Sequence, residues 1–154
     1  MLAALRHFIS RIQQSAEEGE TFDETDHRLA IAALLVHAIS IDGIVEEAEK
    51  TTIRAILKRE YDFSDEQTST LIAEARERDN EAVDLYTFTS VLKRALDADG
   101  RKRSIEMLWE IVYADGEVHE FEDNMVWRVA ELLGVSRRER LRLKKQIAKA
   151  REAN

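Results

Sequence analysis

Two acidic turns with the same residue spacing carry most of the chemistry that this sequence offers. The first reads Asp-Gly-Ile-Val-Glu-Glu-Ala-Glu over residues 42–49, and the second reads Asp-Gly-Glu-Val-His-Glu-Phe-Glu over residues 115–122. Oxygen ligands, carboxylates above all, are what hard divalent cations such as Ca²⁺ and Mg²⁺ bind in proteins. If the two turns face each other, four acids become candidate ligands for one or two cations: Asp42, Glu49, Asp115 and Glu122.

The same residues also have a purely structural interpretation, which the sequence leaves open. Asp-Gly is an ordinary turn dipeptide, and a glutamate in the first turn of a helix is an ordinary capping residue. His119 stands inside the second turn, but the first copy has Glu46 at that position. His37 is expected to be a packed or capping histidine rather than a ligand. No glycine-rich phosphate loop and no Ser/His/Asp set is present, so no enzymatic activity is expected.

The residues on either side of the turns repeat as well. Apolar residues lead into the first turn and leave it, and apolar residues stand 73 positions later at each of these places. A self-match at a fixed offset is the mark of a duplicated supersecondary unit. We therefore predict an internal duplication, with repeats at about 25–79 and 98–151 and pseudo-twofold symmetry that brings the two turns to one end of the molecule.

Apolar spacing and capping residues predict helices throughout. The expected ranges are 2–16, 25–41, 46–60, 65–79, a fifth helix capped by Asp84 and ended by residues 97–100, then 101–114, 119–133, and a last helix to about 153. Asp23 or Thr25 is the expected cap of the second helix. Ser64 with Gln67, and Ser136 with Glu139, form two predicted capping boxes. All five glycines fall at predicted breaks between helices. The two capping boxes lie 72 residues apart, one fewer than the 73 residues that separate the turns. We assign this one-residue slip to the second connection of the repeat unit.

Composition supports a single all-helical domain over residues 1–154, with residues 1–20 as an extension. The 154 residues include no proline, no cysteine and five glycines, which favours long helices and excludes thiolate chemistry and disulfides. No apolar stretch is long enough to cross a membrane. The apolar start carries Arg6 and His7 and lacks a cleavage site of small residues, so we expect a helix there and a cytoplasmic location.

Charge is unevenly distributed along the chain. The net charge is −8, with +6 in residues 137–154 and −14 in residues 1–136. An acidic body opposes nucleic acid as the main partner, because phosphates would be repelled over most of the surface. The basic last helix is suited to an acidic partner or anionic lipid, but it is interpreted as a solvated helix whose cations favour the C-terminal helix dipole.

Both turns and their flanks resemble the TerB-like (tellurite resistance protein B-like) family. The resemblance rests on residues 34–49, on residues 108–122 and on the following Ala-Glu-Leu-Leu-Gly-Val-Ser of residues 130–136, and it covers about residues 25–150. The helix pattern itself predicts a bundle of seven or eight helices, and the resemblance implies an all-helical, internally duplicated fold. It also implies a metal site built from the family's acidic positions, which match Asp42, Glu49, Asp115 and Glu122.

Two functional hypotheses follow from these observations. The first is a cytoplasmic helical module that binds or senses a divalent metal ion and works through protein partners, with a role in stress response and tellurite resistance implied by the resemblance. The second is a metal-free interaction scaffold whose acidic turns are structural. Neither hypothesis includes nucleic-acid binding or stable membrane insertion.

Overall fold

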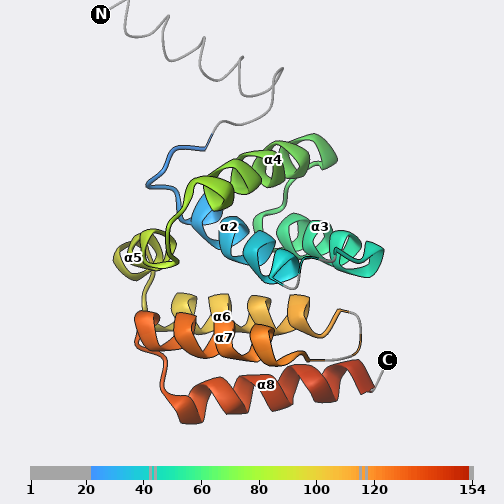
Figure 1. The fold of residues 1–154 in the computed structure, drawn as a ribbon, viewed down its shortest axis with the longest axis vertical. Helices are drawn as coiled ribbons and strands as arrows, with labels where there is room; N and C mark the ends of the chain where they lie inside the picture. The colour runs from blue at the N-terminus through green and yellow to red at the C-terminus, as the bar shows by residue number, and fades with distance from the viewer. Residues whose placement is uncertain (1–21, 42, 44, 115, 117, 153–154) are drawn as a thin grey trace, which may run out of the picture.

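The computed structural model describes residues 22–152 except 42, 44, 115 and 117. Over these residues the chain forms seven α-helices and no strand, which confirms the all-helical prediction. The helix predicted at 2–16 lies outside the described residues. Figure 1 shows the helices stacked between α4 at one end and α8 at the other.

Helix α2 (His27–Ser40) is the centre of the first half of the molecule. Its sequence is apolar on all sides, and ten of its fourteen residues are buried. A helix that is hydrophobic all round must be covered on all sides. Helices α4, α5 and α6 cover it, and α3 adds further contacts. This packing explains why the segment folds as a core helix rather than as a surface one.

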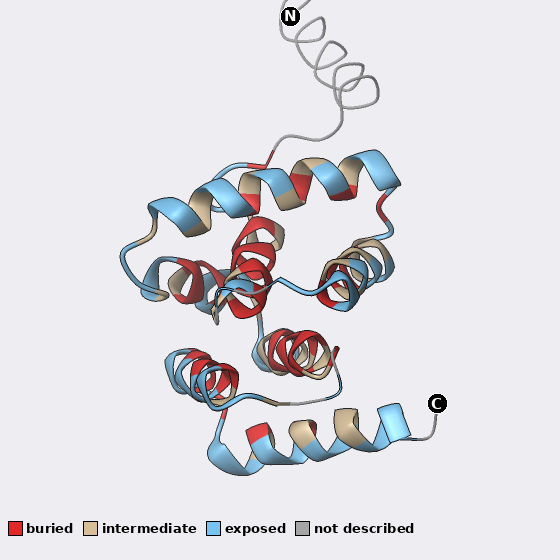
Figure 2. Ribbon diagram, turned by 45° about the vertical axis from the view of Figure 1, so that its right-hand side comes forward, coloured by how far each residue is buried: buried red, intermediate tan, exposed pale blue. Residues whose placement is uncertain are grey.

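The other six described helices include a second central helix, α6. Their bounds are α3 Glu47–Tyr61, α4 Asp65–Glu81, α5 Tyr86–Ala95, α6 Ala98–Val112, α7 Glu120–Leu133 and α8 Arg137–Glu152. Helix α6 packs against α2, α3, α7 and α8. Figure 2 shows buried residues concentrated on α2 and α6, whereas α4 and α8 expose their outer sides. The two outermost helices are therefore amphipathic.

Glycines hold both acidic turns in a conformation that few other residues adopt. Gly43 has φ 80° and Gly116 has φ 89°, in the left-handed region. The Gly43 N–H donates to the Ser40 carbonyl at 3.0 Å, and the Gly116 N–H donates to the Tyr113 carbonyl at 2.9 Å. The equivalent ends of α2 and α6 are thus closed by the same local geometry.

The ends of α3 and α7 show where the repeat offset changes. Asp62 (φ 53°) and Gly134 (φ 75°) are left-handed C-terminal residues, 72 positions apart. Because the turns lie 73 positions apart, the change falls inside these helices, of which α3 has 15 residues and α7 has 14. The predicted slip in the later connection was therefore misplaced. The duplication itself and its symmetry stay a prediction.

Two helix starts differ from the prediction because other aspartates act as caps. Asp26 caps α2, and its Oδ1 accepts from the Arg28 N–H at 2.9 Å. Asp97 caps α6 and accepts from the Gly100 N–H at 2.8 Å, so α6 begins three residues earlier than expected. Gly100 is therefore inside the first helical turn and not at a break. A Cβ there would lie 3.1 Å from Leu96 Cβ, which explains the glycine by close approach.

The two predicted capping boxes have different outcomes. Ser64 and Gln67 exchange both hydrogen bonds, at 3.1 Å and 2.9 Å, so the first box is confirmed. Ser136 accepts from the Glu139 N–H at 3.2 Å, but the Glu139 carboxylate contacts Arg142 at 2.8 Å. The second box expected this carboxylate to accept from the Ser136 backbone N–H. The carboxylate is engaged in an ion pair with Arg142, one turn further into α8.

Candidate functional site

Two of the four predicted metal ligands occupy equivalent places in the fold. Glu49 is the third residue of α3 and Glu122 is the third residue of α7, and their side chains are turned into the protein. Only 5% of Glu49 and 4% of Glu122 is exposed to solvent. Glutamate is rarely buried to this degree unless it is paired. Asp42 and Asp115, the other two predicted ligands, lie outside the described residues.

Glu49 acts as a helix-capping residue. Its Oε1 accepts a hydrogen bond from the backbone N–H of Glu46, the N-cap of α3, at 3.2 Å. This contact is the glutamate half of a capping box, and it agrees with the structural interpretation of the turn. A carboxylate has two oxygens and several acceptor sites, so capping through one oxygen is compatible with metal ligation through the other.

The described residues contain no group of three or more His, Asp or Glu side chains placed to hold a metal ion together. A site at either turn therefore needs residues of the turn itself in addition to the buried glutamates. The donor chemistry fits a hard cation, because every predicted ligand is a carboxylate. A helix N-terminus also favours negative charge close by, which lowers the cost of placing several acids there.

His37 takes no part in the acidic turns. Its Nδ1 lies 2.8 Å from Asp79 Oδ1, and this contact links α2 to α4 across 42 residues of sequence. The prediction of a packed histidine is consistent with this partner. His119, in the second acidic turn, is the N-cap of α7 and is exposed.

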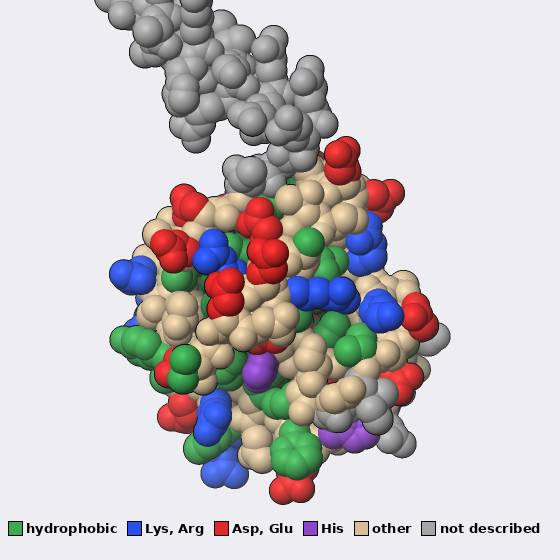
Figure 3. Space-filling view, turned by 45° about the horizontal axis from the view of Figure 1, so that its top comes forward, with side chains coloured by type: hydrophobic (Ala, Val, Ile, Leu, Met, Phe, Trp, Pro, Cys, Tyr) green, Lys and Arg blue, Asp and Glu red, His purple; other side chains and the backbone are tan. Residues whose placement is uncertain are grey.

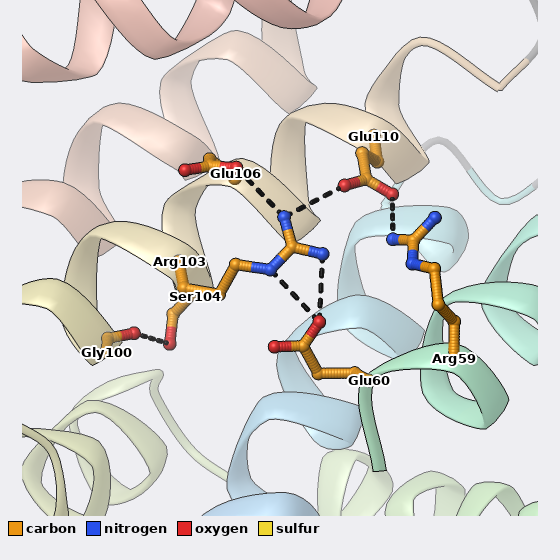
Figure 4. A network of polar contacts seen from close by, with 7 residues as sticks. All are labelled: Arg59, Glu60, Gly100, Arg103, Ser104, Glu106 and Glu110. Atoms are coloured by element: carbon orange, nitrogen blue, oxygen red, sulfur yellow. Dashed lines mark hydrogen bonds and ion pairs between the residues drawn. The ribbon is translucent and has the colours of Figure 1, made fainter. Parts of the chain in front are cut away.

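A cluster of ion pairs that the sequence analysis did not find joins α3 to α6 (Figure 4). Arg103 on α6 donates to Glu60 on α3 at 2.9 and 3.0 Å. It also contacts Glu106 at 2.9 Å and Glu110 at 3.2 Å on its own helix. Arg59 on α3 pairs with Glu110 at 2.7 Å. Two arginines and three glutamates therefore link α3 to α6.

The environment of Arg103 favours its charged form. Burial lowers the pKa of the guanidinium, but the hydrogen bonds and charges of Glu60, Glu110 and Glu106 outweigh that and raise it well above the usual value. The spacing of Arg103 to Glu106 and Glu110, three and seven residues on, was a readable sign of pairs along one helix. The contact with Glu60 depends on tertiary packing, which the sequence alone does not reveal.

A pocket of about 330 Å³ opens where the start of α2 meets the α4–α5 connection. Its apolar wall includes Leu29, Phe88 and Val91, and three acids and one arginine lie around it, namely Glu24, Glu81, Asp84 and Arg78. Val83 beside it is 99% exposed. The sequence analysis did not find this pocket, because its walls come from three separate helices.

Four aromatic side chains of the helices divide into a buried pair and an exposed pair. Trp109 and Phe88 are buried, whereas Trp127 is 46% exposed and Tyr86 is exposed as well. Phe121, directly before the buried Glu122, is 65% exposed. Aromatic side chains on a surface are typical of sites that contact other proteins. The start of α7 therefore presents an apolar side chain next to an acidic turn.

The described helices include none that is both long and apolar enough to reach across a lipid bilayer.

Comparison with known proteins adds one positive finding. The family model for tellurite resistance protein TerB matches residues 28–145, which is most of the chain and includes both acidic turns. The comparisons with curated proteins and with solved structures gave no significant match. The resemblance inferred from the acidic turns is thereby confirmed, and this chain belongs to the TerB family.

Proposed function

We propose that this chain is a cytoplasmic helical module that binds a divalent cation at its acidic turns and acts through protein partners in stress response. The observation that carries the proposal is the matched burial of Glu49 and Glu122 at the same helical position, each after a glycine turn. Two carboxylates held inside the protein next to helix N-termini suit a hard cation such as Ca²⁺ or Mg²⁺. Asp42 and Asp115 are the further ligands that the sequence predicts.

Cation binding at such a site would act by changing how the chain binds a protein partner. Phe121 and Trp127 expose aromatic surface on α7, the helix that carries Glu122. A cation that orders the start of α7 would fix the position of this surface. Membership of the TerB family supports a role connected with tellurite resistance, and it adds no reaction.

A metal-free scaffold is the second candidate, and one contact favours it. The hydrogen bond from the Glu46 N–H to Glu49 shows that this carboxylate already has a structural role. On this alternative the acidic turns shape the helix starts and bind no cation.

Thermal melts with glutamine variants separate the two candidates. Glutamine keeps an acceptor for the capping hydrogen bond but loses the negative charge. We expect the wild type to be stabilised by about 2.7 kcal/mol when the binding cation is at a hundredfold excess over its dissociation constant, relative to EDTA. The double variant Glu49→Gln/Glu122→Gln is expected to melt near the wild type in EDTA and to lose most of this shift.

Exposed acids at the start of the same helices provide the matched control. Glu47 and Glu120 are the first residues of α3 and α7, and both are exposed. Glu47→Gln/Glu120→Gln changes the charge equally and is expected to keep the cation-induced shift. If Ca²⁺, Mg²⁺, Mn²⁺ and Zn²⁺ leave the wild-type melt unchanged, the metal proposal is wrong and the scaffold remains. A shift that survives in Glu49→Gln/Glu122→Gln would place the ligands elsewhere.

A further inference from the structure

Helix α8 carries a continuous basic stripe on its outer side. Arg138, Arg142, Lys145 and Lys149 follow the spacing i, i+4, i+7, i+11, which places them on one face of a helix. All four are exposed. Arg142 pairs with Glu139 on the same helix, and the other three make no ion pair with any residue that the structure describes. The stripe extends over about 16 Å at 1.5 Å per residue.

Helix α4 has a complementary acidic stripe at the other end of the molecule. Glu66, Glu77 and Glu81 are exposed on its outer side, and Glu74 lies half-buried at the edge. Burial raises the pKa of Glu74, and the neighbouring Glu77 raises it too. Figure 3 looks toward the α4 end and shows several acidic side chains close together. Glu66 and Glu77 are as far apart along α4 as Arg138 and Lys149 are along α8.

The two stripes correspond at their ends, where a cation of α8 stands at the place of an acid of α4. Moving back 72 residues from Arg138 and Lys149 gives Glu66 and Glu77, and moving back from Arg142 and Lys145 gives Thr70 and Ala73. Long cationic side chains thus correspond to acids at both ends and to short side chains between them. Short residues leave room for the arginine and lysine stems of a facing helix, while the acids receive the outer charges.

We propose that α8 of one copy docks on α4 of a second copy of this chain, so that the protein associates head to tail. Figure 1 shows α4 and α8 at opposite ends of the described body, so one molecule does not pair its own stripes. When two copies meet through α8 of one and α4 of the other, the pair still has one free α4 face and one free α8 face. Further copies can therefore add, which leads to open chains or closed rings.

A second copy fits the basic stripe better than nucleic acid does. Residues 1–136 carry a net charge of −14, so a polyanion that extends beyond α8 meets a repelling surface. The exposed acids Glu66 and Glu77 of α4 are as far apart along their helix as the two ends of the basic stripe. Exposed ion pairs contribute little individually, because water screens them, so the association is expected to be weak and sensitive to salt.

Sedimentation velocity over a range of protein concentrations tests the proposal. We expect the wild type to associate reversibly at about 0.1 M salt and to be monomeric at about 1 M, where the Debye length falls from about 10 Å to about 3 Å. Two charge-reversed proteins are compared with it. One carries Arg138→Glu, Lys145→Glu and Lys149→Glu, and the other carries Glu66→Lys, Glu77→Lys and Glu81→Lys.

Each reversed protein is expected to be monomeric alone, because its two stripes have the same sign. Their equimolar mixture is expected to associate again, since each basic stripe then meets an acidic one. Lys93→Glu/Arg94→Glu on α5 is the control for charge change away from both stripes and is expected to associate as the wild type does. Circular dichroism melts establish that every variant is folded.

Three results would overturn the proposal. The first is a wild type that stays monomeric at low salt and high concentration. The second is association that survives reversal of α4, which would assign the basic stripe to another occupant. The third is a wild type that does not self-associate but binds a single-stranded oligonucleotide through α8, which would favour nucleic acid instead.

Discussion

Helices α4 and α8 occupy corresponding places in the two halves of the molecule but have opposite charge. Each follows a capping serine, Ser64 or Ser136, and each packs its inner side on a central helix, α2 or α6. Acidic residues of α4 outnumber basic ones by four, whereas basic residues of α8 outnumber acidic ones by six. Helices with the same kind of cap and the same kind of packing partner thus differ in the charge of their outer sides.

The two helices are also attached differently. Leu71 and Ala75 of α4 are completely buried, and the contact of Asp79 with His37 adds a polar link to α2. Helix α8 buries only Arg140 and Leu143. Trp109 of α6 adds a hydrogen bond from its Nε1 to the Arg140 carbonyl at 3.2 Å. Lys144 lies 5.1 Å from the Trp109 ring centre and pairs with Asp123 at 2.7 Å.

The largest predicted effect concerns Trp109, which α8 contacts through Arg140 and Lys144. Trp109→Ala is expected to lower the free energy of unfolding by about 3–5 kcal/mol, because it removes a fully buried aromatic residue and leaves a cavity. Urea unfolding measures the change, and limited proteolysis is expected to cut within α8 first. Trp127→Ala, at an exposed position of α7, is the control and should cost less than about 1 kcal/mol. Equal losses in the two variants would contradict the special role of Trp109.

The sequence predicted the helices and the family because both depend on local signals. Apolar spacing, glycine turns and capping serines act within a few residues, so seven helices were found at nearly correct bounds. The errors came from competing caps. Asp26 and Asp97 were overlooked in favour of neighbouring residues, since several aspartates stood close enough to each helix start.

Features that depend on tertiary packing were largely out of reach. The burial of Glu49 and Glu122 follows from how α3 and α7 pack, although their role as third helical residues was readable from the repeat. Trp127 and Tyr86 have the same helical spacing as core aromatics, yet they lie on the outer side of α7 and α5. The link from Arg103 to Glu60 spans 43 residues of sequence and could not be inferred from spacing.

A second prediction concerns the contact between α3 and α6, where opposite charges are paired rather than segregated. Arg103→Met keeps an unbranched stem but leaves Glu60, Glu106 and Glu110 facing one another without their shared cation. We expect a loss of about 1–3 kcal/mol in the free energy of unfolding, since charged acceptors lose their partner. Chemical denaturation at pH 7 measures it.

Lys145→Met makes the same chemical change on the basic stripe and is the control for that variant. Lys145 makes no ion pair with the described residues, so its substitution should change stability by less than about 0.5 kcal/mol. A similar loss from both substitutions would mean that the contact between α3 and α6 is not specifically stabilised by Arg103.

The smallest prediction compares the caps that begin the two central helices. Asp26 caps α2 and Asp97 caps α6, but only Asp26 also pairs with an arginine, Arg28, at 2.8 Å. Burial raises the pKa of Asp26, while the hydrogen bonds and charge of Arg28 lower it more, so the net direction is down. Asp26→Ala is expected to cost about 1 kcal/mol at pH 7 through the lost cap.

The pH dependence of the stability loss in Asp26→Ala tests whether the pairing with Arg28 contributes to it. A carboxyl whose pKa is lower in the folded state stabilises fully above its unfolded pKa, about 3.9, and this stabilisation is lost as the pH falls through the folded value. The difference between wild type and Asp26→Ala should therefore be constant from pH 7 to pH 5 and shrink below about pH 4. Asp26→Asn, which keeps a capping oxygen without the charge, should recover most of the loss at pH 7. A difference that grew on acidification would contradict the pairing with Arg28 as its cause.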